Sequence, residues 1–169
     1  MPIRKVCLET FVPEIHFQRL RGWLFRPDVA RWWGNPQIAL EHLKRCSPDQ
    51  HAVILADGDP VGYLCWQSPS RNELEDAGLA DLPEDIVDID ILIGEPEFRN
   101  RGVGPRSLEL LLNRLKADPL VSIAGVGTAV SNKRAIRAFE KAGFRVFREF
   151  KDPAFGSSCY MVVRVRNAA

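Results

Sequence analysis

Residues 99–107, Arg-Asn-Arg-Gly-Val-Gly-Pro-Arg-Ser, combine three arginines with two closely spaced glycines. The stretch follows an apolar, strand-like run over residues 86–93 and leads into a helical pattern of leucines over residues 108–115. A loop between a strand and a helix directs backbone N–H groups and the positive end of the helix dipole to the same place. Arginine adds charge and forked donors. The sequence therefore predicts a cradle for a phosphorylated ligand.

Two familiar phosphate-binding loops do not fit this stretch. A P-loop ends in Gly-Lys-Ser/Thr, and no such tripeptide is present. A dinucleotide-binding loop needs glycines directly after the strand and an acid about 20 residues further on. Here residues 95–98 separate the strand from the glycines, and residues 121–124 hold no acid. The spacing that does fit is Arg-x-x-Gly-x-Gly, formed by Arg99, Gly102 and Gly104.

Asp88 and Asp90 stand inside the apolar run before this loop, although aspartate is disfavoured in strands. The two-residue period of a strand places both on one face together with Leu92. Neighbouring carboxylates raise each other's pKa and attract a cationic amine. Asp90 is therefore the candidate catalytic base or amine-orienting group, and Asp88 a candidate supporting acid. Pairing with a core arginine, or exposure at a sheet edge, is the alternative for either residue.

A second segment, residues 131–144, reads Ser-Asn-Lys-Arg-Ala-Ile-Arg-Ala-Phe-Glu-Lys-Ala-Gly-Phe. We expect Ser131 to cap a short amphipathic helix, and Gly143 to end that helix in a left-handed conformation before a strand over residues 144–150. This segment follows the Arg99 loop by about 30 residues. The two motifs, in this order, resemble those of the GNAT acetyltransferases, in which the loop binds the pyrophosphate of coenzyme A.

The resemblance implies a fold and a cofactor. The fold is α/β (α+β), with a mixed, mostly antiparallel central sheet flanked by helices, in a single domain over residues 1–169, and the co-substrate is acetyl-CoA. The backbone of residues 91–93 is the implied donor to the thioester oxyanion. The resemblance places these residues at the cofactor: Ile91, Leu92, Ile93, Arg99, Asn100, Arg101, Gly102, Val103, Gly104, Pro105, Arg106, Asn132, Phe139 and Lys141.

Residues 31–34, 59–63 and 88–94 resemble the aminoglycoside 6′-N-acetyltransferase branch, so that the similarity spans roughly residues 28–165. In that branch an aspartate at the position of Asp90 contacts the reacting amine. The resemblance implies acetyl transfer to a primary amine of a small cationic substrate by direct attack on the thioester, with antibiotic resistance as a consequence. The implied substrate contacts are Trp33, Tyr63 and Asp88, although paired tryptophans such as Trp32 and Trp33 more often belong to a core.

Three departures from that pattern keep other functions open. The place of a tyrosine general acid is taken by Phe139, the stretch 125–130 lacks a substrate-binding aspartate, and Pro105 has no N–H to offer a phosphate. One alternative is an N-acyltransferase for a lysine-like or siderophore amine, a group that tends to have histidine at the position of Asp90. The other is a GNAT domain that binds acyl-CoA without turnover.

Composition and charge limit the remaining classes. The net charge of +1 over 169 residues gives no reason to expect nucleic-acid or membrane binding. Residues 71–90 carry eight acids and one base, whereas residues 99–116 carry five bases and one acid, which suits an anionic cofactor and a cationic substrate. The four cysteines and three histidines lack metal-ligand spacing, so we expect no metal. We expect a cytoplasmic protein with reduced thiols, as a monomer or a homodimer.

The elements that position these residues follow from periodicity and from Pro and Gly. A long loop or short helix is expected over residues 68–84, and Asp57-Gly58 is expected to form a hairpin turn. The other expected helices cover residues 13–25, 27–34 and 36–46, and the strands residues 3–10, 51–56, 60–67, 85–93, 120–126, 144–150 and 159–165.

Overall fold

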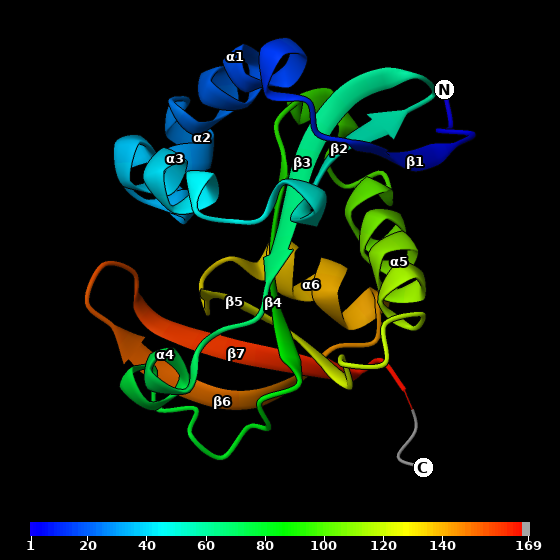
Figure 1. The fold of residues 1–169 in the computed structure, drawn as a ribbon. Helices are drawn as coiled ribbons and strands as arrows, with labels where there is room; N and C mark the ends of the chain where they lie inside the picture. The colour runs from blue at the N-terminus through cyan, green and yellow to red at the C-terminus, as the bar shows by residue number, and fades with distance from the viewer. Residues whose placement is uncertain (167–169) are drawn as a thin grey trace.

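The computed structural model describes residues 1–166 and contains one seven-stranded sheet in the order β1-β2-β3-β4-β5-β7-β6 (Figure 1). The strands are β1 (Val6–Thr10), β2 (His51–Ala56), β3 (Asp59–Gln67), β4 (Ile86–Ile93), β5 (Ile123–Ala129), β6 (Arg145–Asp152) and β7 (Gly156–Arg164). The helices are α1 (Pro13–Leu24), α2 (Pro27–Trp33), α3 (Pro36–Lys44), α4 (Arg71–Asp76), α5 (Val103–Leu115) and α6 (Lys133–Lys141), with short 3-10 turns at Pro48–Gln50 and Pro96–Phe98.

The sheet is antiparallel except between β4 and β5. These two strands pair in parallel only from Ile86 to Asp88, which lies opposite Gly125. Beyond Asp88, β4 pairs with β3 alone and β5 with β7 alone, so the two central strands separate. The predicted mixed, mostly antiparallel sheet flanked by helices is confirmed, and the separation creates the space in which a ligand can lie between the strands.

Two cores cover the two faces of the sheet. On one face α5 and α6 pack against inward side chains of β2–β5, such as Leu64 and Ile89. On the other face α1, α2 and α3 pack against Tyr63, Cys65 and Leu92, and α4 packs near the start of β4 (Figure 1). Because side chains alternate along a strand, Ile89 and Leu92 fall into different cores, as the sequence predicts.

Most differences from the predicted elements concern their ends. β5 begins at Ile123 rather than Leu120, because Leu120 is 78% exposed and its N–H is held in a turn by the carboxylate of Asp118. The long segment before β4 contains α4, which begins with a reciprocal Ser70–Glu73 capping box. None of the helices within residues 1–166 combines the length and the apolar composition needed to cross a bilayer.

Candidate functional site

A cavity of about 360 Å³ opens where β4 and β5 separate. Its walls come from α2, the end of β4, the glycine-rich loop, the start of α5 and one side of α6. The structure thus brings together most of the residues predicted at the cofactor. The predicted residues that line the cavity are Trp33, Ile91, Leu92, Ile93, Arg99, Asn100, Gly102, Gly104, Pro105, Asn132, Phe139 and Lys141.

The glycine-rich loop forms the N-terminus of α5. Gly102 is the N-cap with a φ of +80°, a left-handed conformation that glycine adopts without strain. The helix begins at Val103, so Pro105 occupies its third position rather than the predicted first. The first intrahelical bond runs from the Arg106 N–H to the Gly102 carbonyl. The N–H groups of Val103 and Gly104 have no partner within the helix, which makes this terminus suited to an anion.

The arginines of the loop are not directed as the sequence predicts. The Arg99 guanidinium donates to the carbonyls of Ile93 (2.9 Å) and Gly94 (3.1 Å) and to the Asp28 carboxylate (2.5 Å). Its hydrogen bond holds the pKa of Asp28 below the ordinary value. Arg99 therefore ties α2 to the end of β4, and its donors are already engaged within the protein.

Three other predicted cofactor residues point away from the cavity. Arg101 is exposed and donates to the carbonyls of Met1 and Glu97, and Arg106 donates to the carbonyl of Ile3 at 3.2 Å. Val103 is fully buried in the core under α5. The side chains of these three residues do not line the cavity, but their backbone belongs to the loop and first turns of α5, and the free N–H of Val103 keeps this residue a candidate for the pyrophosphate.

The cations that do line the cavity come mainly from α6. Arg134, Arg137 and Lys141 all lie along it, and only Lys141 was predicted. Their spacing of three and four residues places them on one helical face. This spacing was visible in the sequence and would have identified the other two as phosphate-binding candidates.

Asn132, rather than Ser131, caps α6. Its Oδ1 accepts from the Ala135 N–H (3.3 Å), and its Nδ2 donates to Thr128 Oγ1 on β5 (3.2 Å). Asn132 is buried and lines the cavity with Phe139. Gly143 ends the helix with a φ of +99°, as predicted.

Asp90 lies outside this cavity, one residue before Ile91 in its wall. Its Oδ2 is 3.6 Å from Nε2 of His42 on α3, and the two side chains are 43% and 41% exposed. Gln67 Nε2 on β3 is 3.2 Å from the same imidazole nitrogen. The contact with Asp90 raises the pKa of His42. Sequence reasoning missed His42, because nothing near it in the chain shows that α3 would bring it to β4.

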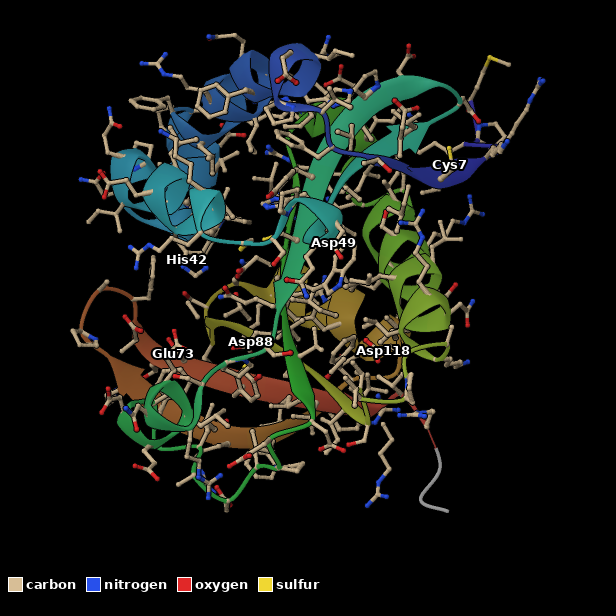
Figure 2. All side chains as sticks on the ribbon, in the orientation of Figure 1. Cys7, His42, Asp49, Glu73, Asp88 and Asp118 are labelled. Atoms are coloured by element: carbon tan, nitrogen blue, oxygen red, sulfur yellow. The ribbon has the colours of Figure 1, made fainter. Side chains whose placement is uncertain are left out.

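Asp88 lies at the point where the strands separate, and Tyr160 on β7 donates to its Oδ1. Burial raises the pKa of Asp88 to about 6. A Cβ at Gly125 would overlap the Tyr160 hydroxyl, so this glycine is what admits the tyrosine. His42 and Glu73 both influence the titration of Asp88, and in Figure 2 the three residues lie toward the left and centre of the view, on α3, α4 and β4.

The raised pKa of Asp88 makes stability depend on pH. The folded state holds this proton up to about pH 6 while the unfolded chain releases it near 3.8, so the stabilisation is complete below pH 3.8 and is lost as pH rises through 6. Between pH 4.5 and pH 7.5 this effect lowers the free energy of unfolding by about 2 kcal/mol, and we expect Asp88→Asn to abolish the decrease. Urea unfolding at pH 4.5 and pH 7.5 measures it. An equal difference between the two pH values in wild type and variant would contradict the assignment.

Tyr63 is not available to a substrate, which corrects its prediction. Its side chain is fully buried among α1, α3 and β2, packs edge-on against Phe11 with ring centroids 5.3 Å apart, and hydrogen-bonds His51 Nδ1. Trp33, by contrast, lines the cavity together with Trp32. The turn between β6 and β7 approaches the same place, because Phe155 lies beside Gly34.

A mixed sheet whose two central strands separate, beside a glycine-rich helix N-terminus, is the arrangement of an acetyltransferase of the GNAT class. The acetyltransferase (GNAT) domain family matches residues 12–152, and the chain belongs to this family. It is therefore an N-acetyltransferase by family.

The individual relatives share only about a quarter of their residues with this chain. Aminoglycoside N(6′)-acetyltransferase type 1 of Klebsiella pneumoniae is 27% identical over 154 residues, which cover 85% of this chain and 75% of the relative. N-acetyltransferase 9-like protein of Nematostella vectensis is 24% identical over 148 residues, covering 80% and 73%. Among solved structures, the aminoglycoside acetyltransferase AAC(6′)-Ib in complex with coenzyme A and kanamycin superposes with a TM-score of 0.76 at 24% identity, covering 95% of each chain.

Proposed function

We propose that this chain transfers an acetyl group from acetyl-CoA to a primary amine of a small cationic, aminoglycoside-like substrate, by direct attack of the amine on the thioester. The observation that carries the proposal is the separation of β4 from β5 beyond Asp88, with the helix N-terminus on one side of the gap and Asp90 at its edge.

The cavity has the chemistry that a CoA thioester requires. The free N–H groups at the start of α5 suit a pyrophosphate, and Arg134, Arg137 and Lys141 add positive charge along the same cavity. The edge of β4 over Ile91–Ile93 offers backbone groups to a pantetheine arm and an N–H to the oxyanion that forms at the thioester carbon. Acetyl-CoA supplies the activated acetyl group.

The acceptor side is acidic. Asp88, Asp90 and Glu73 gather on the face of the sheet that carries α3 and α4, where a cationic amine would be attracted. Asp90 holds the amine near the thioester or takes up its proton, and holding two reactants together contributes several kcal/mol by itself. Phe139 provides no phenol, so the leaving thiolate takes its proton from water.

A lysine-like or polyamine acceptor is the second candidate, and one observation favours it. The stretch of β5 where the aminoglycoside branch has an aspartate holds Gly125 and Gly127 instead, and the ring of Tyr160 lies across both. That carboxylate would otherwise contact a further amine of the antibiotic. A smaller acceptor with one or two amines does not need it.

The test is thiol release from acetyl-CoA by the purified protein against a panel of amines. The panel contains kanamycin-like aminoglycosides, polyamines, lysine derivatives and peptides, and calorimetry measures acetyl-CoA binding in parallel. Release with an aminoglycoside supports the first candidate, and release only with the smaller amines supports the second. Binding of acetyl-CoA without release to any amine would contradict both and indicate a non-catalytic acyl-CoA binder.

A further inference from the structure

We propose that His42 accepts the proton of the attacking amine, while Asp90 and Gln67 hold its imidazole in place. This inference rests on the proposed function, since it concerns the amine side of the same reaction. The proton passes to the imidazole of His42 on α3. Asp90 binds the ammonium form of the substrate and then pairs with the imidazolium.

The hydrogen bonds around His42 define which nitrogen is basic. Gln67 Nε2 lies 3.2 Å from His42 Nε2, and an amide N–H can donate only to an unprotonated ring nitrogen. The other end of the amide is held as well, because the Cys46 thiol donates to Gln67 Oε1 at 3.6 Å. In the free protein the lone pair of Nε2 therefore accepts the Gln67 N–H, and a bound ammonium group takes the place of this amide because both donate to the same nitrogen.

Asp90 and His42 form a pair that a cationic amine can bridge. Their facing atoms are 3.6 Å apart, and both side chains are about two-fifths exposed, so each can be reached from solvent. An ammonium group has three N–H donors, of which one can bind Asp90 Oδ2 and another His42 Nε2. The pair adjoins Ile91, which lines the cavity proposed for the thioester.

The charges around the imidazole favour proton uptake near neutral pH. Asp90 on β4 raises the pKa of His42, Cys46 acts in the same direction, and burial and Arg45 oppose them. Glu73 on α4 is a further acid near His42. Its hydrogen bonds with Ser70 are the main reason that its pKa is lowered, and the charge of His42 acts in the same direction. A general base works best when its pKa lies near the working pH. An imidazole with an acidic partner meets this condition.

The ammonium group transfers one proton to His42 Nε2, and the resulting imidazolium pairs with Asp90. The freed amine attacks the acyl carbon, a C–N bond forms, and the C–S bond then breaks. The second amine proton passes through water to the departing sulfur, and His42 releases its proton to solvent. The products are an amide, a thiol and one proton.

The experiment compares His42→Gln with Glu41→Gln, an exposed neighbour on the same helix. We measure kcat and kcat/KM against pH with two acceptors whose amines differ in pKa, because an inflection that does not move between them belongs to the protein. We expect His42→Gln to lower kcat by about 10²- to 10⁴-fold and to abolish that inflection. The KM for acetyl-CoA and all properties of Glu41→Gln stay at wild-type values.

Two further readouts separate proton transfer from a structural role. Added imidazole is expected to restore part of the activity of His42→Ala, and in an NMR titration Asp90→Asn is expected to lower the pKa of His42. If His42→Gln keeps the wild-type inflection, or loses activity with no change in the pH profile and no rescue by imidazole, the inference is overturned while the proposed function stands. If the wild-type protein acetylates no amine, the proposed function fails and this inference fails with it.

Discussion

Replacing Asp90 by asparagine is expected to lower kcat/KM for the amine by about 10²- to 10⁴-fold, the range over which a group that handles the proton or its partner contributes. The amide keeps the size of the side chain but loses the charge that attracts the ammonium form and that faces His42 at 3.6 Å. Because Asp90 lies outside the cavity lined by the loop and α6, the affinity for acetyl-CoA should not change. Steady-state thiol release and calorimetry measure the two quantities.

The matched control is Asp59→Asn, which removes one exposed carboxylate at the start of β3. Asp90 pairs with Cys65, which lies further along the same strand. The control variant should leave turnover and cofactor affinity as they are. Full turnover by Asp90→Asn would show that the carboxylate neither binds nor deprotonates the amine. A parallel loss of acetyl-CoA affinity would show instead that the substitution disturbs the cavity.

Sequence reasoning succeeded where the determinants are local. Pro13, Pro27 and Pro36 each open a helix, since proline lacks the N–H that the first turn does not use. Asp57 and Gly58 both adopt positive φ, as a two-residue hairpin turn requires. The side-chain alternation of a strand was sufficient to place Asp88 and Asp90 on the face opposite Ile89.

It failed where a side chain's partner is distant in the chain. Arg99 stands in a loop motif, yet its nearest acceptors are strand-end carbonyls and Asp28, 71 residues earlier. Tyr63 lies on the face that α1–α3 cover, and its burial depends on how those helices pack rather than on any pattern in β3. Neither contact has a local signal.

His42 is a candidate functional residue that sequence reasoning missed for the same reason. In the sequence it is one polar residue on the helix Pro36–Lys44, with no acid at ligand spacing. Only the position of α3 over β3 and β4 brings its ring to Gln67 and Asp90. A pair of groups formed by packing of separate elements is visible in three dimensions alone.

Arg99→Ala is expected to lower the free energy of unfolding by about 3 kcal/mol, the scale of several lost charge-assisted hydrogen bonds. The Arg99 side chain is only 10% exposed, and its loss leaves the Ile93 carbonyl without this donor and leaves Asp28 with Arg26 alone. Arg99→Lys should recover only part of this loss, because one ammonium group cannot reach three acceptors at fixed positions. Urea unfolding measures these differences.

Arg101→Ala is the control for this experiment, since Arg101 belongs to the same loop and is exposed. It should change stability by no more than about 0.5 kcal/mol. Acetyl-CoA affinity distinguishes the two possible roles of Arg99. If its alanine variant unfolds at the wild-type urea concentration but binds acetyl-CoA weakly, the guanidinium acts on the phosphate, as the loop motif alone suggests. If the alanine variant unfolds at a lower urea concentration than the wild type, Arg99 supports the cavity by fixing α2 against the end of β4.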